Sequence, residues 1–533
     1  MSYPLAILTA LMVTLAPASF AKPNLLLILA DDLGFSDLGC YGSGIATPNL
    51  DRLAAEGLRL SNFHNTGRCC PSRAALMTGV YPHQAGVGHM LGQTDFPSYG
   101  KGIREDVATL PELLKKEGYH TFMSGKWHLG WEDTYSPDNR GFARFFGSRG
   151  YVDSYFTVVP RTDIYLDDKV ILPAGEQATN PLHPDREFYT TDTYTDYAIH
   201  FIDQHLDHSP EQPFFGYLAY NAPHFPLHAK PEDTAKYRGR FREHGWAPLR
   251  QDRLKGLKRA GLLPEETRIS KRDSPDWASL SDEVKDELDL KFALYCAIID
   301  RLDRTIGRVL EHLESKGALD NTLVVFISDN GSTKETGMFG IGGHKVNPGN
   351  YEDWGRKGGW TSSLGQGWAN VANTPYRRYK REVFRGGTAS PAIFWAGEKV
   401  SARPAANTVS HQVAHIIDLL PTFVEVAGAS APDTEGESLV PVLRGDGIGS
   451  RTLFWEHEGN RAIQDGKWKL VASREEDWQL HDLSEDPSEL HDLSEMAKDQ
   501  RLELESKWQA WADRVGVRPW PEVAKSLAKH RKP

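Results

Sequence analysis

Apolar runs that end abruptly in polar or acidic residues recur along the chain. Each run is apolar nearly throughout and does not alternate with polar positions, which indicates a strand buried on both faces, as in a parallel sheet. Long stretches with helical periodicity separate the runs. The predicted strands are 24–30, 119–124, 213–220, 322–327 and 390–395.

The stretches between the runs predict helices. The longest is 281–316, where an apolar stripe runs from Leu290 to Leu313 and Gly317 follows. Further helices are expected from 47 to 57, over 110–116 and from Asp418. Residues 228–280 are expected to add helices and loops over the sheet, and residues 331–372, rich in Gly, Trp and Asn, to form long loops that line a pocket.

Together these elements predict an α/β fold with a large mixed, mostly parallel sheet sandwiched by helices. Past Gly428 the runs become short, as at 467–471, and a last helix is expected from Ser494, its N-cap, to Val515. We therefore expect a main domain over 22–428 and a smaller C-terminal α+β subdomain over 429–533.

Residues 1–21 are typical of a signal peptide, because an uncharged apolar run over 4–18 precedes the small-x-small sequence Ser19-Phe20-Ala21. An N-terminal membrane anchor is the alternative. No later run of the 533 residues approaches the length of a membrane span, so an exported protein, periplasmic or secreted, is expected. The net charge of −11 argues against nucleic-acid binding through a global basic field. The 4 cysteines form neither a disulfide framework nor a zinc-binding spacing.

Acidic residues follow two of the predicted strands. Asp31 and Asp32 end the first, and Asp329 and Asn330 come directly after the fourth. Since the carboxyl ends of parallel strands meet at one edge of a sheet, these side chains are expected to meet as well. Adjacent carboxylates repel unless a cation lies between them, and oxygen ligands favour Ca²⁺ or Mg²⁺.

The stretch from Asn65 to Gly79 starts as a loop and ends as a short helix. Pro71 suits a first helical position, where its missing N–H costs nothing. Cys69 is thereby placed at a helix N-terminus, which attracts anions, and Arg73 adds a positive charge one turn later.

Three further polar motifs follow other elements. Lys126 and His128 alternate along a chain expected to be extended, so their side chains are expected on one face; His224 lies in a Pro-rich loop, and Lys380 belongs to a basic cluster over 377–381. Any one of them alone would more often be an ordinary loop or surface residue. His344 and Lys345 are weaker candidates for substrate contact, since a solvated turn explains them better.

The motifs taken together resemble the type I sulfatases. The family signature C-x-P-S-R-x-x-L-x-T-G is matched from Cys69 to Gly79, G-K-W-H-x-G at 125–130 and A-P-H-x-P at 222–226. A sulfate-binding Lys upstream of a Gly pair matches Lys380. Two departures are Arg385, where the family often has Glu, and the segment 388–390, which differs from the commoner I-R-x.

The resemblance implies an alkaline phosphatase-like fold and hydrolysis of sulfate monoesters, closest to the bacterial calcium-dependent arylsulfatases. A maturation enzyme would convert Cys69 to formylglycine, whose hydrate is the nucleophile and a metal ligand. His128 would be the base for elimination, His224 the acid for the leaving group, and Lys380 the sulfate holder, while Arg73 and Lys126 orient the nucleophile. One Ca²⁺ would be bound by Asp31, Asp32, Cys69, Asp329 and Asn330.

Two other functions remain open at this stage. A phosphonate monoester or phosphodiester hydrolase of the same superfamily would use much the same site, and a non-catalytic protein that binds sulfated glycans would leave Cys69 unmodified. The substrate class is an anionic sulfated small molecule or glycan. Several aromatic residues near the expected pocket rim would suit stacking on a sugar or aryl ring, although packing in the core or in a loop is the more common role for any one of them: Tyr151, Tyr155, Trp354, Trp360 and Trp368.

Overall fold

A ten-stranded sheet forms the centre of the molecule in the computed structural model, which describes residues 22–152, 154–156, 162–175, 178–341 and 362–530. The proposed signal peptide lies outside these residues. In spatial order the strands are β13 (Thr408–Ser410), β2 (Leu58–Leu60), β12 (Ala392–Ala396), β11 (Thr322–Ser328), β1 (Asn24–Asp31), β10 (Phe214–Pro223), β4 (His120–Lys126), β5 (Arg144–Ser148), β6 (Ile164–Leu166) and β7 (Lys169–Leu172).

The middle of the sheet is parallel. β11, β1, β10, β4 and β5 run in one direction, with a register shift between Leu29 and Asp31 where β1 pairs with β10. β12 pairs antiparallel with β11, and β6 pairs antiparallel with β5. The mixed, mostly parallel sheet expected from the sequence is therefore confirmed. Because four parallel neighbours end at the same edge, polar residues that follow them in the sequence are brought together there.

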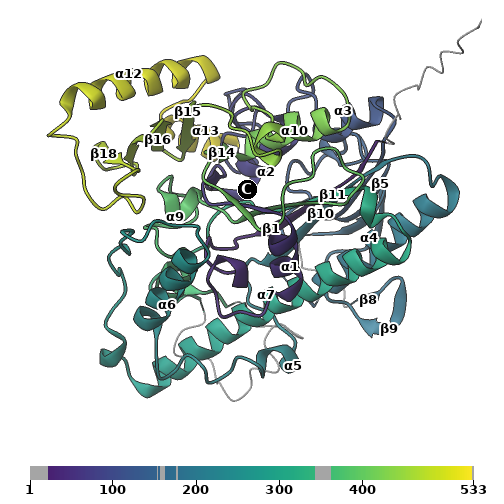
Figure 1. Ribbon diagram of the computed structural model, residues 1–533, viewed down its shortest axis with the longest axis horizontal. Coiled ribbons are helices and arrows are strands. Elements are labelled where there is room, and N and C mark those ends of the chain that lie inside the picture. Colours follow the sequence, from purple (N-terminus) through teal and green to yellow (C-terminus); the bar gives the residue numbers. More distant parts are fainter. Residues whose placement is uncertain (1–21, 153, 157–161, 176–177, 342–361, 531–533) are drawn as a thin grey trace, which may run out of the picture.

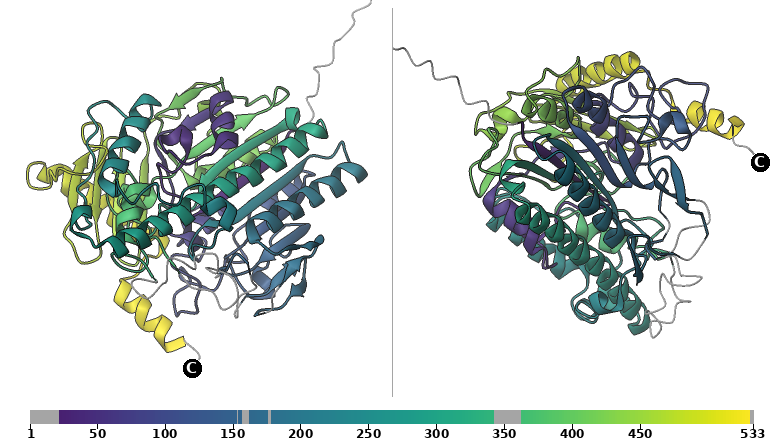
Figure 2. Two further views of the ribbon diagram at one scale, coloured as in Figure 1. Left: turned by 90° about the horizontal axis from the view of Figure 1, so that it is seen from below. Right: turned by 90° about the vertical axis from the view of Figure 1, so that its right-hand side faces the viewer.

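Helices cover both faces of this sheet (Figures 1 and 2). Successive residues of β1 contribute to opposite cores: Leu26 and Ile28 pack with α1, α4 and α7, whereas Leu27 and Leu29 pack with α2, α3 and α10. An uninterrupted apolar strand is the pattern that burial on both faces requires. The helices are α1 (Pro48–Glu56), α2 (Cys69–Thr78), α3 (Leu110–Lys116), α4 (Thr190–His208), α5 (Pro231–Thr234), α6 (Trp246–Arg259), α7 (Asp282–Ser315), α8 (Gly365–Ala372), α9 (Arg385–Thr388), α10 (Leu419–Val426) and α11 (Val440–Leu443).

The C-terminal region forms a separate four-stranded antiparallel sheet. Its strands are β15 (Thr452–His457), β16 (Asn460–Asp465), β17 (Trp468–Ala472) and β18 (Gln479–Asp482), followed by α12 (Lys498–Val515) and α13 (Trp520–His530). Two small sheets pair β3 (Phe63–His64) with β14 (Ala414–His415) and β8 (Thr179–Asn180) with β9 (His183–Glu187). None of the described helices is long and apolar enough to cross a membrane.

Three local expectations were wrong. The last helix begins at Lys498 and not after Ser494, because the Ser494 N–H bonds to Asp492 Oδ1 in a turn. The stretch 331–372 is not all loop, since it ends in α8. Helix α2 begins at Cys69, so Pro71 is its third residue, still among the first N–H positions that lack a partner in a helix.

Candidate active site

Four parallel strands end at the site. Asp31 is the last residue of β1, Lys126 the last of β4, Asp329 follows β11 and His224 follows β10. Helix α2 starts at the same place and brings Cys69 there. The strand-end juxtaposition expected from the sequence is thus present in the structure.

Glycine is needed just before Lys126. Gly125 has φ +129°, and a Cβ added there would lie 2.0 Å from the carbonyl oxygen of Ala219 on β10. The chain then turns sharply, because His128 has φ +59°. Both side chains reach the site, since Lys126 contacts Asp31 and His128 contacts Cys69, and the backbone leaves the extended conformation at His128.

A buried acidic cluster lies at the centre of the site. Asp32 accepts a hydrogen bond from Asn330 Nδ2 at 2.6 Å, and its backbone N–H donates to Asp329 Oδ1 at 3.3 Å. Asp31 and Asp329 are fully buried, and burial beside Asp31 raises the pKa of Asp329 well above its usual value. These carboxylates need cations to remain charged.

Three cationic side chains lie around the cluster. Lys126 contacts Asp31, Lys380 Nζ lies 2.7 Å from Asp32 Oδ1, and Arg73 Nη2 lies 2.9 Å from Asp329 Oδ2. Although burial opposes it, the charge of Lys126 holds the pKa of Asp31 well below its usual value. Lys380 is buried on Asp32 rather than solvated with the rest of its basic cluster.

Three oxygens of the cluster are buried without a hydrogen bond among the described residues: Asp31 Oδ1, Asp32 Oδ2 and Asn330 Oδ1. They come from the ends of two neighbouring strands, β1 and β11. Unpaired buried oxygens are costly, and a hard cation would satisfy them. The donor set therefore fits Ca²⁺ or Mg²⁺.

Cys69 is the buried first residue of α2, a helix whose first four N–H groups lack intrahelical partners. A hydrogen bond from Cys70 and the charge of Lys380 hold the pKa of the Cys69 thiol well below its usual value. His128 also hydrogen-bonds to Cys69, and burial together with Lys126 lowers the pKa of His128 to about 4. A neutral imidazole thus contacts the side chain at position 69.

His224 lies on the more open side of the cluster. Its Nδ1 donates to the carbonyl oxygen of Phe225 at 2.5 Å, which leaves Nε2 facing Asp32 Oδ2 at 3.6 Å. Its side chain is 13% exposed, whereas those of Lys126 and Lys380 are 1% exposed. Of these three side chains, His224 is the one that an entering ligand can reach most readily.

Two of the three aromatic rim candidates in the described part of the chain are in the core, which is the more common role for a single aromatic residue. Tyr155 is fully buried and donates to the carbonyls of Asn221 and His224, so it supports the His224 loop from behind. Trp368 is stacked on Phe292 in the core. Tyr151 is half-buried with its ring 6.3 Å from that of His128. The remaining candidates, Trp354, Trp360, His344 and Lys345, lie outside the described residues.

Sequence reasoning missed two neighbours of Cys69. Met90 Sδ lies 3.9 Å from Cys69 Sγ, and Arg68 forms a 3.0 Å ion pair with Glu335 next to it. Met90 belongs to a loop without periodicity, so only its position in space identifies it. Arg385, a departure from the family pattern, is buried against Asn62 and the carbonyl of Pro487, where it anchors the C-terminal region rather than the rim.

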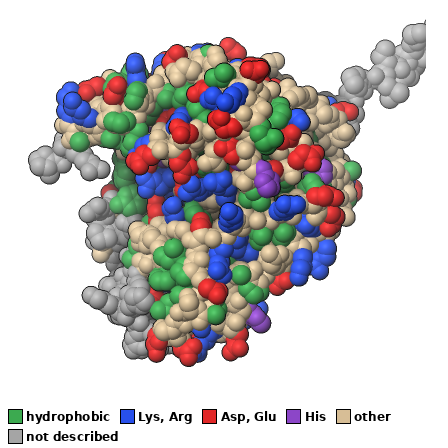
Figure 3. Space-filling view, turned by 90° about the vertical axis from the view of Figure 1, so that its left-hand side faces the viewer, with side chains coloured by type: hydrophobic (Ala, Val, Ile, Leu, Met, Phe, Trp, Pro, Cys, Tyr) green, Lys and Arg blue, Asp and Glu red, His purple; other side chains and the backbone are tan. Residues whose placement is uncertain are grey.

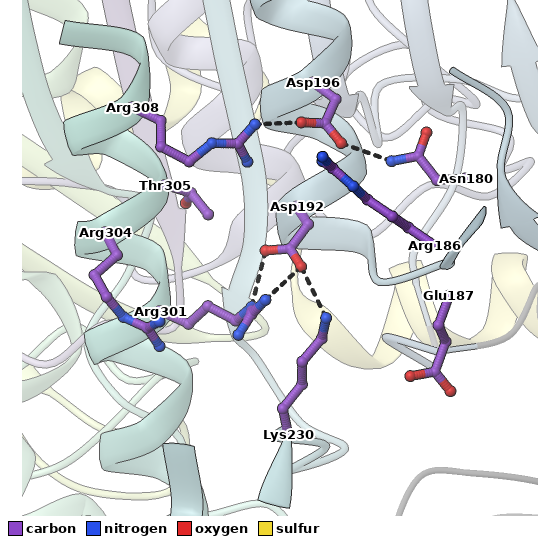
Figure 4. Close-up of a pocket in the computed structure, with 10 residues that line it drawn as sticks. All are labelled: Asn180, Arg186, Glu187, Asp192, Asp196, Lys230, Arg301, Arg304, Thr305 and Arg308. Atoms are coloured by element: carbon purple, nitrogen blue, oxygen red, sulfur yellow. Dashed lines mark hydrogen bonds and ion pairs between the residues drawn. The ribbon is translucent and has the colours of Figure 1, made fainter. Parts of the chain in front are cut away.

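Two charged cavities lie outside this cluster. One, of about 490 Å³, lies between α4, α7 and β9, where Arg301 pairs with Asp192 and Arg308 with Asp196 (Figure 4). The other, of about 540 Å³, is lined by Arg268, Lys271, Arg377 and Arg378 among others. Figure 3 shows Lys and Arg side chains gathered in the middle of one face. This acidic protein therefore has local basic surface.

Comparison with known families and proteins agrees with this architecture. The Sulfatase family model matches residues 23–429, and the model of the N-sulphoglucosamine sulphohydrolase C-terminal region matches 398–513. The chain is 30% identical to an arylsulfatase of Klebsiella aerogenes over 423 residues, 76% of this chain and 87% of the relative. It is 30% identical to the N-acetylgalactosamine-6-sulfatase of Homo sapiens over 445 residues, 81% and 68% of the two chains.

The solved structure of Ps i-CgsB in complex with k-i-k-neocarrahexaose superposes with a TM-score of 0.66 and 26% identity, covering 92% of this chain and 93% of that one. The phosphonate monoester hydrolase of Agrobacterium radiobacter shares the fold, with a TM-score of 0.56 and 18% identity, covering 93% of this chain and 96% of that one. With a family model that spans most of its length, this chain belongs to the sulfatase family and is a sulfuric ester hydrolase with an alkaline phosphatase-like fold.

Proposed function

We propose that the protein hydrolyses sulfate monoesters through a formylglycine formed from Cys69, with one Ca²⁺ held by Asp31, Asp32, Asp329 and Asn330. The observation that carries the proposal is the position of Cys69. It lies at a helix N-terminus, in contact with neutral His128 and beside a buried acidic cluster with three unpaired oxygens. A bound Ca²⁺ would compensate negative charge on the sulfate ester.

During the reaction the side chain at position 69 becomes a sulfate ester. It must therefore be able to release that sulfate afterwards. In the hydrated aldehyde, one hydroxyl attacks sulfur and displaces the alcohol, and the second, once deprotonated, expels inorganic sulfate and regenerates the aldehyde. A serine at this position would keep the sulfate as a stable ester. We propose that a maturation enzyme installs the aldehyde during biogenesis.

The surrounding residues take complementary roles. His128, neutral and in contact with position 69, accepts the proton of the second hydroxyl. His224 protonates the leaving oxygen through Nε2, since its Nδ1–H is committed to the Phe225 carbonyl. Lys126 and Arg73 fix the carboxylates and orient the nucleophile, and Lys380 holds the sulfate.

The substrate class we propose is an aryl sulfate or a sulfated carbohydrate, supported by the similarity to the Klebsiella arylsulfatase and the human N-acetylgalactosamine-6-sulfatase. We also propose that residues 1–21 are removed on export to the periplasm or outside the cell, that 22–428 form the catalytic domain, and that 429–533 form a C-terminal subdomain. The N-terminal sequence of the mature protein tests the first of these points.

The direct test compares catalytic efficiency on an aryl sulfate with that on an aryl phosphodiester, using protein produced with its maturation enzyme. We expect a clear preference for the sulfate and loss of most turnover in Cys69→Ala. A preference for the phosphodiester would favour the phosphonate monoester or phosphodiester hydrolase instead. Full activity in Cys69→Ala would exclude position 69 as the nucleophile.

A further inference from the structure

A second group of metal-ligating side chains lies outside the acidic cluster. His89, in the loop that follows α2, meets His457 and Glu458 at the turn between β15 and β16. One ligand atom from each of the three lies within 4.8 Å of the other two. Two imidazoles and one carboxylate make up this group, which we call the hairpin cluster.

The separations in the hairpin cluster suit a small tetrahedral cation. His89 Nδ1 and His457 Nε2 lie 3.5 Å and 3.6 Å from the same oxygen, Glu458 Oε1. Ligands about 2.0–2.1 Å from a tetrahedral metal are separated by about 3.3 Å. Both distances are too long for good hydrogen bonds. They are close to the separation expected between two ligand atoms of one tetrahedral metal ion.

The imidazole nitrogens of the cluster lack other partners. His89 Nδ1 and both ring nitrogens of His457 are buried without a hydrogen bond among the described residues. His457 is fully buried, and the His89 ring is covered by Trp520. A buried imidazole with no hydrogen bond is unfavourable, and its burial disfavours protonation, which leaves a neutral ring able to bind a metal.

The backbone at Glu458 supports a role for its side chain. Glu458 and Gly459 form a two-residue turn, since His457 pairs with Asn460, and both have positive φ, 54° and 85°. Such turns favour Asn or Asp followed by Gly, so a Glu in the first position is unfavourable for the backbone.

Arg381 orients the Glu458 carboxylate. Its Nη2 lies 2.5 Å from Glu458 Oε2, which directs Oε1 toward the two imidazoles. The other nearby guanidinium, that of Arg68, is paired with Glu335. A partner on the second oxygen that fixes a liganding carboxylate is a usual feature of metal sites.

We propose that His89, His457 and Glu458 bind one Zn²⁺ ion, separate from the cation of the acidic cluster. Two imidazole nitrogens and one carboxylate oxygen form a donor set typical of zinc, with the fourth position left to water. A bound ion would link the loop around residue 89, which follows α2, to the turn between β15 and β16. These two strands belong to the four-stranded C-terminal sheet and not to the main sheet.

The test titrates Zn²⁺ into the full chain by isothermal calorimetry and follows its melting temperature. Cys69→Ser protein with saturating Ca²⁺ is used, because Cys69, Cys70 and His128 form another possible zinc-binding group. We expect about one equivalent of Zn²⁺ to bind and to raise the melting temperature, since the ion binds the folded state alone.

Variants locate the ion. In the same background, Glu458→Gln and His89→Gln should each weaken Zn²⁺ binding by at least about tenfold, since loss of even an outer-shell partner costs about 10–100-fold. The matched control is His120→Gln. His120 stacks on His205 at 4.7 Å, and no carboxylate among the described residues completes a metal-binding group with this pair, so its loss should leave binding unchanged.

The proposal is overturned if calorimetry detects no stoichiometric Zn²⁺, or if Glu458→Gln and His89→Gln bind it as tightly as the parent. The two variants alter different segments of the chain, so a folding defect in one of them would not explain loss of zinc binding in both. The melting temperature without zinc reports whether each variant is folded. Failure here leaves the proposed hydrolysis at position 69 untouched, since zinc binding and turnover are measured separately.

Discussion

Individual residues of the site are positioned by contacts between opposite charges that are buried from solvent. Asp31, Asp32 and Asp329 are buried, and each contacts a lysine or arginine drawn from a different element. A carboxylate in such surroundings stays charged only because its partners remain in place. Activity is therefore expected to be sensitive to single substitutions here.

His224 gives the sharpest residue-scale prediction. His224→Ala should lower kcat by about 10²–10⁴-fold for an alkyl sulfate, because its leaving group needs a proton, and by much less for an aryl sulfate with an acidic leaving group. Steady-state kinetics on the two substrates measure the difference. His208→Ala, an exposed histidine on α4, is the control. Equal losses on both substrates would mean that His224 is not the general acid.

Asp32 provides a test of the cation that does not depend on turnover. Ca²⁺ should raise the melting temperature of the parent protein, because the ion binds only the folded acidic cluster. In Asp32→Asn the increase should largely disappear, since one of the unpaired oxygens then belongs to a neutral amide. Thermal unfolding in Ca²⁺ and in a calcium chelator measures the shift, and an undiminished shift in the variant would place the ion elsewhere.

At the scale of elements, the sequence predicted the buried strands and the polar residues at their ends well, because the pattern of apolar and polar positions and the length of a strand are local properties of the chain. It failed where tertiary contacts decide. It could not decide between a rim position and a core position for Tyr155 and Trp368, which are both in the core. The turn at His128 and the partners Met90 and Glu335 depend on chain segments far apart in sequence, which one sequence does not place.

One element-scale prediction concerns pH. Nδ1 of His415 accepts the N–H of Ile417 before α10, and burial together with Arg451 lowers the pKa of His415 to about 3. Below about pH 6.5 the unfolded chain binds a proton that the folded chain does not, so stability falls as pH falls from 6.5 toward 3, by up to about 1.4 kcal/mol per pH unit.

His415→Asn should keep the cap and remove this proton, because Asn is a good N-cap residue. Denaturant unfolding between pH 7 and pH 5 should then show a shallower loss of stability than in the parent. Other buried histidines, such as His64 and His457, would still contribute to the slope. An unchanged slope would mean that His415 is protonated in the folded protein.

For the whole molecule, the C-terminal sheet and the main sheet share one apolar core. Trp455 of β15 packs in the same cluster as α2 and donates to the carbonyl of Asn65 at 2.8 Å, and Trp511 of α12 packs on Tyr81. Lys469 of β17, buried with Glu489, donates to the carbonyl of Val383. The small antiparallel sheet thus supports the loop that carries Cys69.

A fragment of residues 22–428 is therefore expected to aggregate or to expose apolar surface. Removal of 429–533 takes away Trp511 and Trp455, and so uncovers the surface around Tyr81 and Asn65 on which they pack. Size-exclusion chromatography and dye binding measure this, with the 22–533 chain as the control. A soluble, monomeric fragment that unfolds cooperatively would show that the main sheet needs no C-terminal region.

The measurement that tests the central claim most directly is mass spectrometry of a peptide spanning Cys69 and Cys70, from protein produced with its maturation enzyme. The account predicts the mass decrease of thiol-to-aldehyde conversion, with fragment ions that place the change at position 69. An unmodified thiol at position 69 in active protein would contradict the proposed nucleophile.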